Sequence, residues 1–345
     1  GLLDAYARKA VLQTILQVPT DSEILRLGKD ETRFTYVLQS YEGKRAFFNL
    51  SHVVRAFRPN DLSLFGKAGV FVDRFWEFVA GKDRLRNEVE GSITKVIFGT
   101  LLMTMMMAVV VVPFGVITAL YLREYAKQGP LVSIVRIAVN NLAGVPSIVF
   151  GIFGFGFFSI VVGGQIDDWL YPHRLPNPTY GGGGILWASL TLALLTVPVV
   201  IVATEEALAS VPSAQREASL GCGASRFQTI IRVILPQATP GILTGTILAM
   251  ARGAGEVAPL MLVGVVPSTE DFPIDGFAPF FHLERKFEHL GFHIFDLSFQ
   301  YKEPDYARPF VFSSALLLLA VVASLNIFAI RLRNRLRRKF KTSHV

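Results

Sequence analysis

The sequence predicts an all-α polytopic membrane protein, and three observations support this fold class. Residues 96–122 form a run of 27 residues without a charged side chain, longer than the roughly 20 apolar residues that span a bilayer as a helix. Charged residues make up 18% of the 345-residue chain, whereas a soluble domain carries about a quarter. The mean hydropathy is +0.44. A soluble enzyme and a disordered chain are therefore excluded.

Residues 1–92 differ from the rest of the chain. They contain 14 Lys and Arg against 12 Asp and Glu, and none of their apolar stretches is long enough to span a bilayer. Residues 2–17 could form an amphipathic helix, and residues 34–38 alternate weakly, as a strand does. We expect a small water-facing domain of α/β or mixed structure; the alternative is an amphipathic arm lying on the membrane.

Five membrane spans are predicted within residues 93–331, the expected transmembrane domain. The first contains Pro113, which predicts a kink, and the fourth contains Gly241 and Gly245, whose spacing suits close helix approach. The five apolar segments are residues 96–122, 137–162, 185–204, 238–266 and 310–330.

The orientation of these spans follows from the charges between them. Connection 123–136 carries three bases against one acid, Glu124, and connection 205–237 carries three arginines. Connection 163–184 carries two acids against one base, and connection 267–309 carries eight acids against four bases. Seven Lys and Arg residues at 331–341 equal the whole net charge of +7. Because positive loops face the cytoplasm, the first two connections named and the C-terminus are predicted to be cytoplasmic.

This orientation places residues 1–92 outside the cell and residues 332–345 in the cytoplasm as a basic tail. We therefore expect a multi-pass protein of the inner, cytoplasmic membrane. An external start without a visible export signal also leads us to expect a sixth span ahead of the first residue of this sequence. The location of the basic block directly after an apolar segment argues against nucleic acid as a partner.

Catalytic signatures are absent from the sequence. No Gly-x-x-x-x-Gly-Lys-Ser/Thr motif is present to hold a nucleotide. His289 and His293 have helical spacing, but Gly291 and a polar external loop around them argue against a metal site. One cysteine, Cys222, permits no internal disulfide bond. The chain is predicted to be no enzyme and to bind no cofactor.

Connection 205–236 is the most informative segment. Pro212 suits the start of a helix, Gly223 can end one in the left-handed conformation, and Pro236 is expected to stop a second helix before the next span. A helix–turn–helix of about 30 residues is longer than a connection between spans requires, and long connections tend to be functional.

This connection resembles the "EAA" loop of binding-protein-dependent ABC importer permeases. The match rests on Glu217, Ala218, Ser219, Gly223, Leu235 and Pro236, with Ser219 where the motif usually has alanine. The resemblance implies a type I ABC importer transmembrane domain whose loop forms a coupling helix that docks on a separate ATPase. An ordinary surface helical hairpin is the alternative.

Residues 141–151 and 251–260 resemble signatures in the second and fourth spans of the phosphate permeases of this family, the PstA type, with Gly253 in place of an alanine. The resemblance implies inward transport of inorganic phosphate. It also implies a heterodimer with the homologous permease PstC, two copies of the ATPase PstB, which would hold ATP and Mg, and the periplasmic phosphate-binding protein PstS.

Polar residues inside the spans are candidates for the substrate pathway. Arg252 and Glu256 are four residues apart near the middle of an apolar segment, where charges are costly, and a guanidinium matches a tetrahedral oxyanion; mutual neutralisation is the alternative. Arg136 could assist anion exit or be an ordinary positive flank. Asn140 and Asn141 could contact substrate or hydrogen-bond neighbouring helices.

Two other functions stay open from the sequence. The loop motif does not distinguish a phosphate permease from a permease for sulfate or molybdate. A membrane scaffold or sensor of phosphate signalling is an alternative of a different class.

Overall fold

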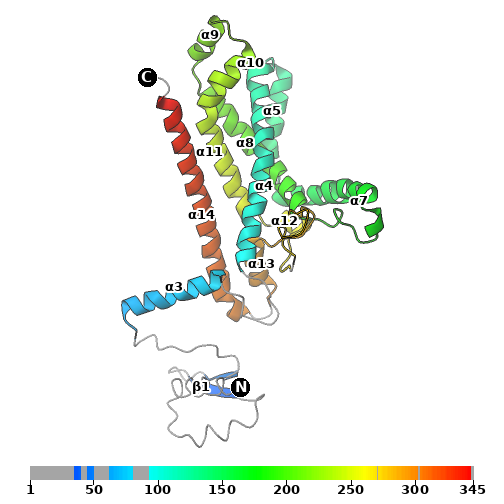
Figure 1. Ribbon diagram of the computed structural model, residues 1–345, viewed down its shortest axis with the longest axis vertical. Helices are drawn as coiled ribbons and strands as arrows, with labels where there is room; N and C mark the ends of the chain where they lie inside the picture. Colours follow the sequence, from blue (N-terminus) through cyan, green and yellow to red (C-terminus); the bar gives the residue numbers. More distant parts are fainter. Residues whose placement is uncertain are drawn as a thin grey trace, which may run out of the picture. The chain divides into compact units, whose positions relative to one another are not determined.

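The computed structural model divides the chain into two compact units, residues 1–76 and 77–345. The residues that the structure describes are 35–39, 45–49, 62–80, 93–269, 271–301 and 304–342 (Figure 1). The predicted helix at residues 2–17 lies outside the described residues.

The described part of the first unit contains a hairpin. Strands β1 (Thr35–Gln39) and β2 (Arg45–Asn49) pair antiparallel, with Val37 opposite Phe47. The weak alternation at residues 34–38 therefore corresponds to a strand over most of its length. Helix α3 (Leu64–Ala80) follows and continues into the second unit.

Within the described residues, five helical segments are long and apolar enough to cross a membrane. They are Ile93–Tyr125, Ser147–Leu170, Ile185–Ala209, Arg226–Gly255 and Ala307–Arg335. The predicted first, third and fifth spans are confirmed as apolar helices. The fifth belongs to α14 (Pro304–Thr342), so much of the expected basic tail continues the same helix.

Helix α8 (Ile185–Ala209) is the centre of the second unit. It packs between α4 (Ile93–Leu120) and α11 (Leu235–Gly255), and 67% of its most apolar stretch is buried, against 6% for the last span (Figure 1). Met103 and Met107 of α4, Leu192 and Leu195 of α8 and Ala249 of α11 belong to one buried apolar cluster.

Small residues allow this close packing. A Cβ atom at Gly241 would overlap the Cβ of Ala207, and one at Gly245 would overlap the Cβ of Ala203. The predicted close approach at this pair of glycines is confirmed. In the contact between α4 and α8, a Cβ atom at Gly115 of α4 would come within 2.6 Å of Val200 Cγ1 of α8. The three helices meet at distances that larger side chains would prevent.

The second predicted span has the wrong boundaries. The chain forms α5 (Pro130–Leu142), turns at residues 143–146, and begins a new helix at Ser147. Pro146 has an extended ψ of 136° and no N–H to continue the preceding helix. The second span is instead built from α6 (Ser147–Phe153), the π-helical η3 (Gly154–Gly163) and α7 (Gly164–Leu170).

The fourth predicted span also differs. Helix α11 ends at Gly255, after which Glu256 is extended and Val257–Pro259 lead into the short α12 (Leu260–Val263). At its other end Pro236 does not stop a helix, because the chain runs from α10 (Arg226–Thr229) through the π-helical turn η5 (Ile230–Ile234) into α11. Pro236 lies in the first turn of α11. The π-helical turn η5 just before it lets the helix continue although Pro236 has no N–H to donate.

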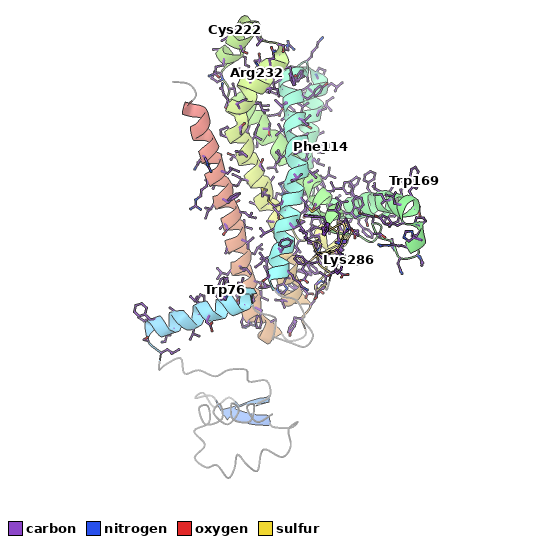
Figure 2. All side chains as sticks on the ribbon, viewed as in Figure 1. Trp76, Phe114, Trp169, Cys222, Arg232 and Lys286 are labelled. Atoms are coloured by element: carbon purple, nitrogen blue, oxygen red, sulfur yellow. The ribbon has the colours of Figure 1, made fainter. Side chains whose placement is uncertain are left out.

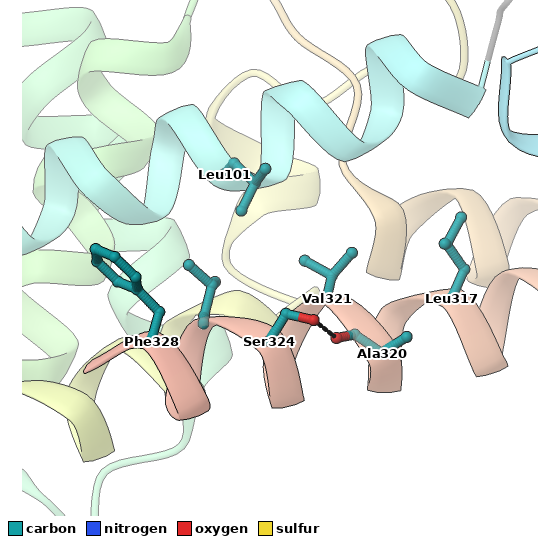
Figure 3. A pocket seen from close by; sticks show the side chains of 7 residues that line it. Leu101, Leu317, Ala320, Val321, Ser324 and Phe328 are labelled. Atoms are coloured by element: carbon teal, nitrogen blue, oxygen red, sulfur yellow. Dashed lines mark hydrogen bonds between the residues drawn. The ribbon is translucent and has the colours of Figure 1, made fainter. Parts of the chain in front are cut away.

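An apolar groove of about 420 Å³ runs between α4 and α14 (Figure 3). It is lined by Leu101, Leu317, Ala320, Val321, Ser324, Leu325 and Phe328. Ser324 Oγ donates a hydrogen bond to the Ala320 carbonyl at 2.7 Å. The hydroxyl in this lining is thus satisfied by its own helix.

We expect Gly245→Ala to lower the melting temperature of the detergent-solubilised protein by several degrees, because forced overpacking costs about 1–3 kcal/mol. Gly255→Ala is the matched control, since a Cβ there meets no atom within 4 Å. Melting curves followed by fluorescence-detected size exclusion would measure both. Equal melting temperatures would show that α8 and α11 are not in close contact.

Candidate functional site: a coupling loop and two charged clusters

The loop between α8 and α11 is an exposed pair of short helices. Pro212 immediately precedes α9 (Ser213–Gly221), in which no residue is buried. Gly223 has a φ of 84°, in the left-handed region, and turns the chain. Helix α10 (Arg226–Thr229) begins with a capping box between Ser225 and Gln228. The predicted helix–turn–helix is confirmed in its first helix and its turn.

Polar contacts of two side chains, Arg216 and Ser219, hold α9 to the rest of the bundle. Arg216 Nη2 lies 3.1 Å from Glu124 Oε1 and donates to the Leu208 carbonyl at 2.6 Å. Glu124 belongs to the π-helical turn η2 (Tyr121–Tyr125) that ends the first span. Ser219 Oγ lies 2.9 Å from Thr229 Oγ1, which joins α9 to α10. The loop is therefore connected to the end of the first span and to the beginning of the fourth.

The structure places the motif residues in two groups. Glu217, Ala218 and Gly223 are exposed, and Ser219 is half-buried against α10. Leu235 and Pro236 are half-buried at the start of α11, beyond η5. Cys222 is exposed at the turn between the two groups (Figure 2). Helix α9 lies at the outer end of this loop (Figure 1).

Sequence reasoning missed three residues at this loop. Leu220 and Phe227 are large apolar side chains exposed at 45% and 65%, and apolar residues in a polar loop were an available signal. In the sequence Glu124 counts only as the one acid of connection 123–136. Its pairing with Arg216 joins residues 92 positions apart in the chain, and no local pattern indicates such a contact.

The first charged cluster lies beside the loop. On α5, Arg136 Nε contacts Glu205 Oε1 at 3.0 Å, and its Nη1 donates to Gln128 Oε1 at 3.1 Å. A small cavity of about 130 Å³ adjoins them. It is lined by Leu122, Arg136, Val139, Asn140, Ile201, Val202, Glu205 and Glu206. With two carboxylates against one guanidinium, this cavity does not favour an anion.

Asn140 and Asn141 are both exposed on α5, which is too short to cross a membrane. The expectation that they lie inside the second span is therefore wrong, because Pro146 separates α5 from that span. Asn140 lines the small cavity next to Arg136.

The second charged cluster lies at the far end of α11. Arg252 Nε is 3.4 Å from Glu256 Oε1, and the two side chains are 35% and 20% exposed. Arg252 is in the last turn of α11 rather than in the middle of the span, because the helix ends at Gly255. It is 17 residues beyond Leu235, or about 26 Å along the axis. The expected pathway residues thus fall into two groups at opposite ends of the bundle.

His289 is buried and His293 is half-buried, so neither lies in the polar loop expected. His289 is fully buried at the start of α13 (Leu290–Phe299), where its Nδ1 accepts a hydrogen bond from the Gly291 N–H at 3.2 Å. Among the residues that the structure describes, His, Cys, Asp and Glu form no group of three that could hold a metal ion.

The segment between α12 and α13 is held by an ionic network. Asp275 accepts from the Phe277 N–H at 2.9 Å and from Arg285 Nη1 at 2.6 Å, and His282 Nε2 lies 3.1 Å away. The Phe277 N–H and the Arg285 guanidinium lower the pKa of Asp275 from 3.8 to about 2. Asp275 therefore stays ionised over the physiological pH range, and its contacts shape this segment.

Comparison with known proteins agrees with this architecture. Residues 111–342 match the family model described as "Binding-protein-dependent transport system inner membrane component". A bacterial ABC transporter involved in the import of the acidic polysaccharide alginate shares the fold, with a TM-score of 0.51 and 14% identity over 78% of this chain and 89% of that chain.

Curated relatives carry names of the same kind. The "Phosphate transport system permease protein PstA" of Mycobacterium leprae is 35% identical over 248 residues, 71% of this chain and 72% of the relative. The "Probable ABC transporter permease protein YqgI" of Bacillus subtilis is 30% identical over 67% of this chain and 74% of the relative. The chain therefore belongs to the family of binding-protein-dependent transport system inner membrane components.

Proposed function

We propose that this chain is a membrane-spanning permease subunit of an ATP-driven importer that moves inorganic phosphate into the cell. The observation that carries the proposal is the exposed coupling loop, joined by side-chain contacts to the first and fourth spans. The relatives named as phosphate transport permeases support the substrate. The chain itself carries out no chemistry.

The partners follow from this role. A homologous permease, PstC, would complete a heterodimer, two copies of the ATPase PstB would hold ATP and Mg, and PstS would deliver phosphate from outside. The exposed Glu217 and Ala218 of α9 offer the surface for the ATPase, with Leu220 and Phe227 as apolar contacts beside them. The exposed coupling helix is the part of the chain that fits a docking partner of this kind.

Coupling would travel along one helix. The segment Arg226–Gly255 is continuous from the loop to Arg252, and at 1.5 Å per residue its 30 residues extend about 45 Å. Ser219 and Thr229 join α9 to the beginning of this segment, and Arg216 joins α9 to the end of the first span. A displacement of α9 by the ATPase would therefore move both α4 and α11.

Arg252 is the residue that we assign to the phosphate pathway. Its guanidinium has five N–H donors, of which Nε faces Glu256. The remaining donors suit a tetrahedral oxyanion, and Glu256 would orient the guanidinium and keep phosphate from binding too tightly. Arg136 is already paired with Glu205, so we assign it to the attachment of α5 to α8.

The orientation proposed here places the coupling loop and the C-terminus in the cytoplasm and residues 1–92 outside. We expect a membrane-impermeant maleimide to label Cys222, the single cysteine of the chain, in inverted vesicles but not in intact cells. In a Cys222→Ser protein, a cysteine in place of the exposed Asp271 should show the opposite pattern. Labelling of both cysteines from the same side of the membrane would contradict this topology.

We expect Arg252→Ala to reduce uptake of radiolabelled phosphate by the assembled transporter by about two orders of magnitude, because removing a charge-assisted contact to an oxyanion costs several kcal/mol. Arg174→Ala, which removes an exposed arginine from an external segment, should leave uptake unchanged. Normal uptake by Arg252→Ala would remove Arg252 from the pathway. If excess unlabelled sulfate or molybdate reduced the uptake of radiolabelled phosphate, the substrate would be assigned to another oxyanion.

The pair Arg216–Glu124 should be needed for coupling. We expect Arg216→Glu and Glu124→Arg each to lower phosphate-dependent ATP hydrolysis about tenfold, and the double exchange to restore most of it, because a half-buried ion pair broken on one side leaves a charge without its partner. Full ATP hydrolysis in both single variants would show that coupling does not depend on this contact. Phosphate uptake that persists after deletion of the loop would instead favour a role of the chain as a membrane scaffold.

A further inference from the structure

Helix α3 has two chemically distinct faces. At about 100° per residue, most of its apolar side chains occupy an arc of roughly 160°, while Val70 lies on the opposite side and Ala80 lies beyond one edge. The side chains within the arc are Leu64, Phe65, Ala68, Phe71, Val72, Phe75, Trp76, Phe78 and Val79. Asp73 lies on the opposite side, and Lys67 and Trp76 border the two edges of the arc. This helix is strongly amphipathic, but it forms no part of the proposed transport machinery.

The apolar face is uncovered along most of its length. Phe65 is 91% exposed, and Leu64, Phe71, Val72 and Trp76 are each exposed by more than 60%. Soluble proteins rarely expose a contiguous set of large apolar side chains, because their contact with water is unfavourable. The face therefore requires an apolar environment.

The last turn of α3 is fixed at one end of the spans. Phe78 and Val79 pack against a buried cluster that includes Ile93 and Val96 of α4. Thr94 Oγ1 donates a hydrogen bond to the Val79 carbonyl at 2.6 Å. Ile93 is the first residue of the first span, at the end of the bundle opposite the coupling loop. The last turn of α3, which belongs to the second unit, is thus attached to the first residues of the first span.

We propose that α3 lies in the membrane interface, with its apolar face among the acyl chains of the leaflet opposite the coupling loop. The large exposed apolar side chains of α3, together with the attachment of its last turn to the first residues of a membrane span, identify lipid as the occupant. Trp76 and Lys67 at the edges of the arc match the headgroup boundary, where an indole ring and a snorkelling ammonium are both favourable. Asp73, on the far side of the helix, then faces water.

A pair of labelled proteins tests this inference. In a Cys222→Ser background, Val72→Cys and Asp73→Cys each receive a nitroxide, and the full-length protein is reconstituted in phosphatidylethanolamine–phosphatidylglycerol vesicles. Electron paramagnetic resonance then measures collisions with oxygen, which concentrates in lipid, and with a water-soluble nickel chelate. We expect the ratio of oxygen to nickel accessibility to be several-fold higher at position 72 than at position 73.

Two results would overturn the proposal. Equal nickel accessibility at both positions would show that the apolar face is in water. Protection of position 72 from both reagents would show that a protein covers it. Ala68→Cys provides a second label on the apolar face if Val72→Cys yields little protein, and it is read against the same Asp73 control.

Discussion

The close contact of α8 with α4 and α11 is the constraint on which the rest of the structure depends. In a bilayer the hydrophobic effect does not drive helices together, so packing of small residues must do so. Gly115, Gly241 and Gly245 lie at these contacts, and each faces a neighbour that leaves no room for a Cβ atom. The coupling loop and Arg252 are both carried by helices of this three-helix core.

Hydropathy predicts part of the fold because some spans are simple apolar runs. The runs at 96–122, 185–204 and 310–330 could be predicted as helices, because the helices of the first two continue past their internal prolines, Pro113 and Pro198. The two other spans depend on prolines whose effects differ. Pro146 separates two helices, whereas Pro236 lies within the first turn of one. The difference comes from the adjoining π-helical turn, and a local sequence pattern does not show where such a turn forms.

The candidate site was predictable where its residues are close in sequence. Pro212 and Gly223 act as local signals, and the structure uses them as expected for a helix start and a left-handed turn. The ion pair between Arg216 and Glu124 joins two distant segments, and so does the contact of Arg136 with Glu205. Such contacts arise from packing, and charge counts along the chain do not reveal which partners meet.

The uninterrupted helix from Arg226 to Gly255 has a thermodynamic consequence for the proposed importer. Its two ends would bind different things, an ATPase and an anion, and coupling between two sites is reciprocal. If docking of the ATPase changes the affinity for an anion at Arg252 by some factor, binding of the anion must change the docking affinity by the same factor. A single helix that serves both ends thus makes substrate occupancy a quantity that the ATPase can sense without touching the substrate.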